Sequence, residues 1–266
     1  MSTRQESMWE AAFAALDQDP RRALKLARKA RDLSPDAEAW YNYGSVALEA
    51  GDSAEAREAV RRTLALDPEH PDAWALLARL HFDVGAWKEA DEAVDNALSR
   101  DEEHPEARYL RGCLLERRGQ FDAADTELQA AHEEAPDDFP EVRWLSDTAI
   151  EAAAEAVLSS LPERVGAALL DVHILIDEVP SDAVLSMVEP RPSPDGLLAC
   201  FDGAPVGDRG GSDALALLPA TILLFRRNLM RIPPDALEAE LEITLLHEIG
   251  HFLGLDEDDL EERGLG

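Results

Sequence analysis

The chain has 266 residues, a formal net charge of −31 and two cysteines. So strong an acidic balance repels phosphate backbones and anionic lipid surfaces at long range, which argues against nucleic-acid and membrane partners. The two cysteines lie in different halves and imply no disulfide framework, the first residues lack a signal-peptide pattern, and no apolar run reaches the roughly 18 to 20 residues that span a bilayer. We therefore expect a cytoplasmic protein.

The length and the charge distribution favour two domains. A chain of this length can bury one large core or two ordinary ones. Residues 137–266 contain no lysine and carry a net charge of −19, whereas residues 1–136 carry −12. A break at Pro136-Asp-Asp-Phe-Pro140 coincides with this change. We predict a helical repeat domain over residues 1–136 and a second domain over residues 137–266.

Self-similarity at a period of 34 residues marks the N-terminal half. Equivalent positions share a residue type: Trp40 and Trp74; Gly44, Ala78 and Gly112; Gly51, Gly85 and Gly119; Ala56, Ala90 and Ala124; Val60, Val94 and Leu128. Small residues let two antiparallel helices cross closely, and glycine permits the turn between them. The sequence predicts helix-turn-helix repeats that start near Ala37, Pro71 and Pro105, after a degenerate N-terminal copy that acts as a cap.

The 34-residue pattern resembles the tetratricopeptide repeat. The resemblance implies an all-α superhelix, in which about four stacked copies bury their faces against one another. It also implies that the concave groove of the superhelix binds a peptide or a partner protein. The alternative is an array that serves only as a spacer or a dimerisation surface.

The segments that follow show both helix and strand patterns. Residues 142–161 are alanine-rich, and we expect a helix whose packing stripe is Val142, Leu145, Ala149, Ala153, Ala156 and Val157. Short apolar runs predict strands over residues 172–176, 197–201 and 221–225, with a Pro- and Gly-rich loop over residues 190–219. Three short strands with flanking helices predict an α+β domain of about 130 residues.

The last long helix carries start and stop signals. Asp235 follows two prolines and can act as the N-cap, with Glu238 completing a capping box. The predicted core stripe consists of Leu237, Leu241, Leu245, Ile249 and Phe252. Gly250 permits a close backbone approach, and Gly254 ends the helix and lets the chain turn back.

This helix contains the box His247-Glu248-Ile249-Gly250-His251. The two histidines lie one turn apart on one face, so both imidazoles can reach one zinc ion. Glu248 lies beside them and can take the proton of a metal-activated water as a general base. The alternatives are a chance match and a helix surface that merely carries two histidines.

The acids after the box supply candidates for a third zinc ligand. A catalytic zinc site takes three protein ligands and keeps one position for water. In the longer box of metzincins the third ligand lies ten residues after the first histidine, and that position is Glu257. Asp256 is the second candidate, and Asp258 also flanks Glu257. Alternatively these acids begin a solvated helix that Asp256 caps, and one acid can cap while another binds the metal.

Five segments carry a more specific resemblance. They are residues 161–163, 172–180, 197–206, 218–226 and 247–258, in this order. Together they resemble the small bacterial zincin-like zinc metallopeptidases, over about residues 138–263. The resemblance implies a minimal zincin fold, in which a short twisted sheet covers an active-site helix, with zinc as the cofactor and a peptide or protein as the substrate. No methionine turn follows the box, so the likeness to metzincins extends to ligand spacing only.

The sequence does not identify the group that would stabilise an oxyanion. All three tyrosines lie in the repeats, so none from the second domain can act there. The remaining candidates are His173, Arg209, Arg226 and a backbone N–H group. We expect the substrate backbone to lie antiparallel to the edge strand 197–201.

The leading hypothesis is a zinc-dependent peptidase whose repeat array recruits a substrate or a partner protein. The alternative is a protein-interaction scaffold with a structural or inactive zincin domain. A third interpretation is metal storage by the acidic tail. The intact box favours the enzyme, because a scaffold would not need Glu248.

Overall fold

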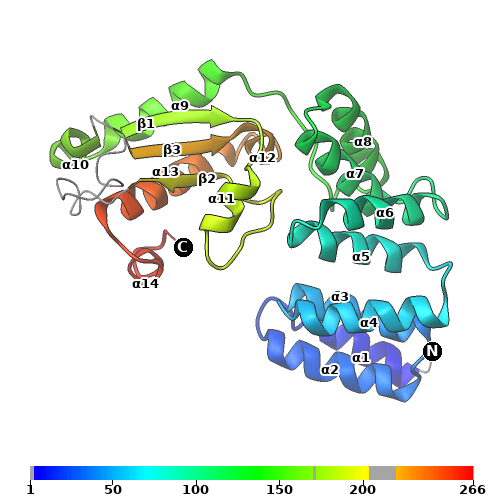
Figure 1. Ribbon diagram of the computed structural model, residues 1–266. Coiled ribbons are helices and arrows are strands. Elements are labelled where there is room, and N and C mark those ends of the chain that lie inside the picture. The colour runs from blue at the N-terminus through cyan, green and yellow to red at the C-terminus, as the bar shows by residue number, and fades with distance from the viewer. Residues whose placement is uncertain (1–2, 170–171, 204–219, 266) are drawn as a thin grey trace. The chain divides into compact units, whose positions relative to one another are not determined.

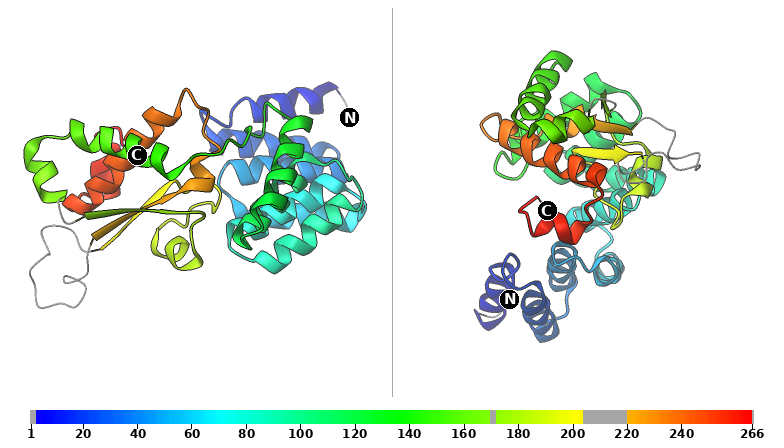
Figure 2. Two further views of the ribbon diagram at one scale, coloured as in Figure 1. Left: turned by 90° about the horizontal axis from the view of Figure 1, so that it is seen from above. Right: turned by 90° about the vertical axis from the view of Figure 1, so that its left-hand side faces the viewer.

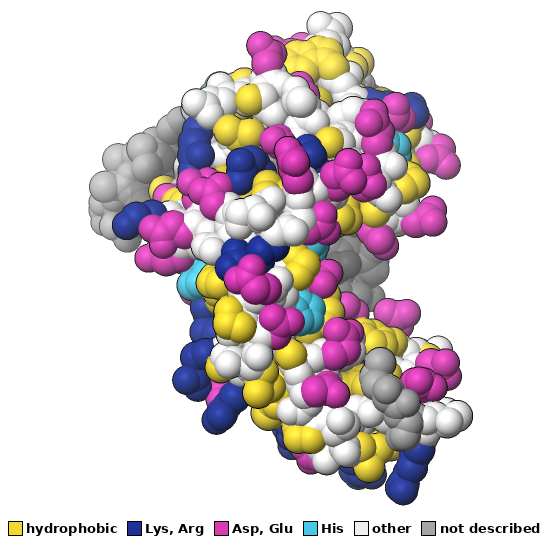
Figure 3. All heavy atoms as spheres, turned by 90° about the vertical axis from the view of Figure 1, so that its right-hand side faces the viewer, with side chains coloured by type: hydrophobic (Ala, Val, Ile, Leu, Met, Phe, Trp, Pro, Cys, Tyr) yellow, Lys and Arg dark blue, Asp and Glu magenta, His cyan; other side chains and the backbone are white. Residues whose placement is uncertain are grey.

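The computed structural model describes residues 3–169, 172–203 and 220–265. It divides the chain into two compact units, Met1–Phe139 and Pro140–Gly266 (Figure 1). Among the described residues, no helix is both long and apolar enough to cross a membrane. Asp and Glu side chains are scattered over the face shown in Figure 3, among basic and hydrophobic groups, rather than gathered into one patch.

The N-terminal unit consists of helical hairpins. Its helices are α1 (Thr3–Phe13), α2 (Pro20–Leu33), α3 (Ala37–Glu49), α4 (Ser53–Leu66), α5 (Pro71–Asp83), α6 (Trp87–Leu98), α7 (Pro105–Arg117) and α8 (Phe121–Glu134). Each odd-numbered helix packs against the even-numbered helix that follows it, and α5 also packs against both α3 and α7. The helices α3, α5 and α7 begin at the predicted repeat starts. The predicted tetratricopeptide-like superhelix is thus confirmed.

Small residues allow the hairpins of this unit to close. Gly51, Gly85 and Gly119 occupy the turns with φ of +80°, +74° and +69°, a region that other residues rarely adopt. A Cβ added to Gly44 would lie 3.2 Å from the Ala59 Cβ, and one added to Gly112 would lie 2.5 Å from the Leu128 Cγ. The helices of these hairpins therefore cross at distances that larger residues would prevent.

Two histidines link successive repeats, a role that the sequence analysis missed. His70 and His104 are N-cap residues, and the Nδ1 atom of each accepts the backbone N–H of the third residue on. The His104 Nε2 atom then lies 3.3 Å from Asp72 Oδ1 of the preceding repeat. This hydrogen bond is the main reason why the pKa of Asp72 lies below its usual value. The period of 34 places His70 in the same way, 3.6 Å from Glu38 Oε2.

The C-terminal unit is an α+β domain built on a three-stranded sheet. Its elements are α9 (Asp147–Ser160), α10 (Glu163–Ala168), β1 (Val172–Asp177), α11 (Asp182–Met187), β2 (Ala199–Asp202), β3 (Ala220–Phe225), α12 (Arg226–Leu229), α13 (Leu237–Leu253) and α14 (Glu257–Glu261). The strand order is β1-β3-β2, with β1 parallel and β2 antiparallel to β3. The predicted α+β class and its three strands are confirmed. Residues 204–219 of the expected loop lie outside the described residues.

One core joins the sheet to α9 and α13. Ile222 and Leu224 of β3 are fully buried in it, and the helices contribute Ile150, Ala154, Val157, Leu241, Leu245, Ile249 and Phe252. Figure 2 (left) shows both helices on the same side of the sheet, with α11 on the other side. The predicted core stripe of the last helix is confirmed: four of its residues belong to this core, and Leu237 is partly buried and packs against it.

The predicted start of the alanine-rich helix is wrong, and its predicted stripe is confirmed only in part, because Val157, Ala153 and Leu145 pack in this core. The helix α9 begins at Asp147 with Ser146 as its N-cap, five residues after the expected start, and Ala149 and Ala156 are exposed. The physical reason is a long-range anchor on the segment before the helix. Arg226 pairs with the Asp147 carboxylate, and its guanidinium lies 5.0 Å from the Trp144 ring centroid. This anchor holds residues 144–146 outside the helix and Asp147 at its first position.

The predicted capping box of the last helix is also wrong. The helix α13 begins at Leu237, and its N-cap residue Ala236 provides no side-chain hydrogen bond. The N–H groups of Ala236 and Leu237 both donate to the Pro233 carbonyl, at 2.9 and 3.0 Å. A backbone turn therefore satisfies the donors that a capping side chain would have bonded, and Asp235 remains exposed in that turn.

Candidate metal centre

The packing of α13 decides where its histidines lie. Leu245, Ile249 and Phe252 are buried against the sheet, while His247 and His251 lie on an adjacent side of the helix and are partly exposed. Gly254 ends the helix with φ +88°, as predicted, and its left-handed conformation reverses the chain. The acids that follow α13 therefore return beneath the two histidines.

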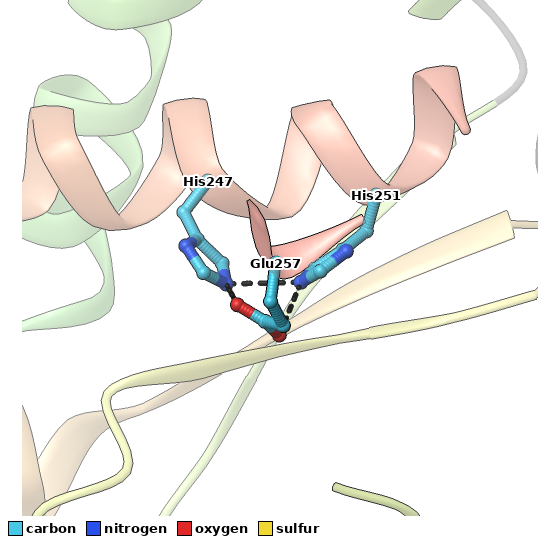
Figure 4. A group of neighbouring side chains, drawn as sticks. All are labelled: His247, His251 and Glu257. Atoms are coloured by element: carbon cyan, nitrogen blue, oxygen red, sulfur yellow. Dashed lines mark hydrogen bonds and ion pairs between the residues drawn. The ribbon is translucent and has the colours of Figure 1, made fainter. Parts of the chain in front are cut away.

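Three side chains converge below α13. The two histidine Nε2 atoms are 2.9 Å apart, and the Glu257 carboxylate lies 3.3 Å from His251 Nε2 and 3.8 Å from His247 Nε2 (Figure 4). All three candidate ligand atoms lie within 4.8 Å of one another. The side chains come from two elements, α13 and α14, and all of them point into one small space (Figure 4).

Main-chain carbonyl groups fix the tautomers of both histidines. His247 Nδ1 lies 2.7 Å from the Leu265 carbonyl oxygen, and His251 Nδ1 lies 3.2 Å from the Leu255 carbonyl oxygen. A carbonyl oxygen only accepts hydrogen bonds, so each Nδ1 carries a hydrogen, and Nε2 is the ring nitrogen left to bind a cation. Two ring nitrogens and a carboxylate thus face one another. Such a set of acceptors fits a cation.

Zinc is an ion that suits this donor set. It binds histidine nitrogen and carboxylate oxygen at about 2.0 to 2.2 Å, and two histidines with one glutamate form a known catalytic combination. Hydrogen bonds from the non-ligating ring nitrogens to carbonyl groups are the usual support of histidine ligands. His247, His251 and Glu257 are all at least partly exposed, so the three side chains can be reached from solvent.

The two leading acids have different places in the structure. Asp256 is the N-cap of α14, and its carboxylate accepts the Asp259 N–H at 2.9 Å. Glu257 is the first residue of the same helix, and it is the acid that joins the histidines. Asp258 is exposed and lies outside the three-residue group. The structure thus brings Glu257, and not Asp256, toward the two imidazoles.

Gly250, in the His247–His251 box, allows α14 to pack against α13. The Leu260 side chain is fully buried and packs over Gly250, where an added Cβ would overlap Leu260 Cδ2. We expected a close backbone approach at this glycine, but the neighbour is a side chain. Gly250 therefore helps to seat the helix that carries Glu257.

The Glu248 carboxylate is buried between α13 and the sheet. Its Oε2 atom accepts the Phe201 backbone N–H of β2 at 2.6 Å, and the residue is 8% exposed. Burial raises the pKa of Glu248, whereas the nearby His247 and the hydrogen bond from Phe201 act in the opposite direction. A carboxylate with a raised pKa accepts a proton more readily than an exposed glutamate does.

The strand β2 lies beside the candidate site. It is an edge strand of the three-stranded sheet, it packs against α13, and the rings of Phe201 and Phe252 meet at a centroid distance of 5.9 Å. Burial and the neighbouring Glu248 raise the pKa of the Cys200 thiol in this strand to about 12. Cys200 therefore remains protonated, and a protonated thiol is neither a nucleophile nor a metal ligand.

Two of the sequence-based oxyanion candidates, His173 and Arg226, lie away from the three converging side chains. His173 is exposed on β1, the strand separated from β2 by β3. Arg226 interacts with Asp147 and Glu178. Arg209 lies outside the described residues. The functional groups that the sequence analysis missed are the Leu255 and Leu265 carbonyls and the Phe201 N–H. As main-chain groups, they give no side-chain signal.

Comparisons with protein families match two different parts of the chain. The "Zincin-like metallopeptidase" family matches residues 169–266, and tetratricopeptide-repeat families match residues 15–71, 47–96 and 81–145. No curated protein matches the chain.

Similar solved structures cover about half of the chain or slightly more. The MamA protein is 25% identical over 49% of this chain and 72% of its own, with a TM-score of 0.39. YrrB, described as a TPR protein with an unusual peptide-binding site, is 18% identical over 50% and 70%, with a TM-score of 0.39. TTC0263 of Thermus thermophilus, described as a thermophilic TPR protein, is 19% identical over 60% and 93%, with a TM-score of 0.45. By its family matches, the chain carries tetratricopeptide repeats over residues 15–145 and a zincin-like metallopeptidase domain over residues 169–266.

Proposed function

We propose that the protein is a zinc-dependent peptidase and that its repeat array recruits the substrate or a partner protein. The observation that carries this proposal is the convergence of three side chains: His247 and His251 of α13 and Glu257 of α14. They lie next to the buried Glu248. A domain that served only as a scaffold would need neither three converging acceptors nor a glutamate held beside them. The match to a metallopeptidase family supports the same conclusion.

The three converging side chains hold the metal, and Glu248 moves the proton. When bound, zinc supplies Lewis-acid activation of water and of the peptide carbonyl. Glu248 accepts the proton of the attacking water and passes it to the leaving amine, as a general base and then a general acid. Its hydrogen bond to the Phe201 N–H fixes the carboxylate next to the histidines. Its burial favours proton uptake.

The edge strand β2 is the proposed place for the substrate backbone. An extended peptide can add to an edge strand through main-chain hydrogen bonds, and β2 is the edge strand that packs against α13. His173 lies on β1, and Arg226 pairs with Asp147. Among the described residues, a backbone N–H group is therefore the candidate left to stabilise the oxyanion. The proposed substrate is therefore an unstructured or locally unfolded polypeptide.

A Glu248→Gln variant tests this function. Its amide oxygen can still accept the Phe201 N–H, so we expect the fold and zinc binding to persist, while cleavage of an unstructured polypeptide falls about 10²- to 10⁴-fold. The matched control is Glu242→Gln, which removes an exposed carboxylate from the same helix and should leave cleavage unchanged. Zinc content and peptide cleavage are measured on the same preparations.

Two outcomes would contradict the proposal. Equal cleavage rates for the wild type and Glu248→Gln would remove Glu248 from the reaction. A wild type that binds zinc but cleaves no unstructured polypeptide would instead favour a protein-interaction scaffold with an inactive zincin domain.

A further inference from the structure

We propose that the main-chain carbonyl of Leu265 positions His247 for metal binding, so that the segment after α14 is part of the metal centre. The inference rests on the proposed zinc site and adds a positioning residue to it. Leu265 lies 18 residues beyond His247 in sequence, yet its carbonyl oxygen is 2.7 Å from His247 Nδ1. The contact therefore joins α13 to a segment that follows the next helix.

The two histidines depend on different parts of the chain. The Nδ1 partner of His251 is the Leu255 carbonyl, four residues away, and it belongs to the turn that ends α13. The Nδ1 partner of His247, the Leu265 carbonyl, lies beyond α14, in the turn that follows that helix. His251 is therefore oriented locally, whereas the orientation of His247 requires that the later segment is docked.

One buried side chain and two backbone hydrogen bonds hold Leu265 in place. Leu260 is fully buried over Gly250 and anchors the segment to α13. The N–H groups of Gly264 and Leu265 donate to the Glu261 and Leu260 carbonyls, both at 3.0 Å. Gly264 has φ +72°, which only glycine adopts without strain. This left-handed residue turns the chain so that the Leu265 carbonyl faces the imidazole.

The hydrogen bond has two effects on His247. It holds the hydrogen on Nδ1, which keeps the Nε2 lone pair free for the ion, and it restricts rotation of the ring. Loss of such an outer hydrogen bond commonly weakens metal affinity about 10- to 100-fold. Because the partner is a carbonyl group of the main chain, the side chain of Leu265 is not required.

Three variants separate the carbonyl from the side chain. A chain that ends at Gly264 lacks the carbonyl, Gly264→Ala strains the turn that aims it, and Leu265→Ala keeps it and trims only the side chain. In the metal-free proteins, ¹⁵N NMR reports which ring nitrogen of each histidine is protonated. In parallel, competition with a chelator gives the zinc dissociation constant, and thermal unfolding checks that each variant is folded.

We expect Nδ1 to be protonated on both histidines of the intact chain and of Leu265→Ala. In the shortened chain, His247 should lose this preference while His251 retains it, and the zinc dissociation constant should rise about 10- to 100-fold. Gly264→Ala should show a smaller change in the same direction.

An unchanged His247 tautomer together with an unchanged zinc affinity in the shortened chain would overturn the inference. So would a loss of the Nδ1–H tautomer from both histidines, because it would indicate general disorder of the site rather than loss of one contact. If the intact chain bound no zinc, the proposed function would fail separately. The tautomer of metal-free His247 would still show whether Leu265 orients the ring.

Discussion

The two units of the molecule are held together in different ways. In the N-terminal unit, each helix packs mainly against its sequence neighbours, and the contacts recur from one repeat to the next. In the C-terminal unit, contacts far apart in sequence fix the important groups. Phe201 N–H bonds to Glu248 across 47 residues, and Arg226 pairs with Asp147 across 79 residues. The comparison shows that the repeat array can be built from local contacts, whereas the position of Glu248 and the start of α9 depend on residues far away in the sequence.

The largest expected effect is a loss of zinc affinity that distinguishes Glu257 from Asp256 at the start of α14. Glu257→Gln removes a proposed ligand, and we expect zinc affinity to fall by more than about 100-fold, beyond the usual cost of an outer contact. Asp256→Asn removes the same charge one residue earlier, but asparagine is a good N-cap residue, so zinc affinity should change little. Zinc competition titrations of both variants measure the difference.

The reverse result would reassign the site. If Asp256→Asn lost zinc and Glu257→Gln retained it, then Asp256 would be the ligand. The first turn of α14 would then have to rearrange when the ion binds, because the Asp256 carboxylate would leave its capping position.

A smaller effect tests the local construction of the repeats. In Gly112→Ala the new Cβ would lie 2.5 Å from Leu128 Cγ, and we expect a net loss of about 1 to 2 kcal/mol in unfolding free energy. Gly44→Ala, whose nearest neighbour would be Ala59 Cβ at 3.2 Å, should cost less. Gly166→Ala in α10 is the control, because nothing lies within 4 Å of its added Cβ, and it should gain up to about 1 kcal/mol.

Urea unfolding of these three variants gives the order of stabilities. If Gly112→Ala were as stable as the wild type, α7 and α8 would pack less closely than the structure indicates. The repeats would then depend less on small crossing residues than the 34-residue pattern suggests.

Much of the fold could be predicted because its signals are local. The repeat starts at Ala37, Pro71 and Pro105 follow from the 34-residue period, and the core stripe of α13 follows from its apolar spacing. Gly254 also correctly predicted the end of that helix. In each case, the residue type and its near neighbours carry the information.

The errors occurred where distant groups or the main chain decide. The start of α9 depends on Arg226, far along the sequence, and the start of α13 depends on the Pro233 carbonyl rather than on the Asp235 side chain. At the candidate site, the pattern selected the two histidines and Glu248. It ranked Glu257 ahead of Asp256 but could not decide between them, because the choice depends on which acid caps α14.

The measurement that tests the central claim most directly is a crystal structure of the zinc-loaded protein with anomalous scattering at the zinc edge. We expect one zinc ion, with His247 Nε2, His251 Nε2 and a Glu257 carboxylate oxygen at about 2.0 to 2.2 Å. Absence of zinc after equilibration with a zinc salt would contradict the account. Several weakly held ions among the acids of the C-terminal segment would contradict it equally, because they would indicate metal storage rather than a single site.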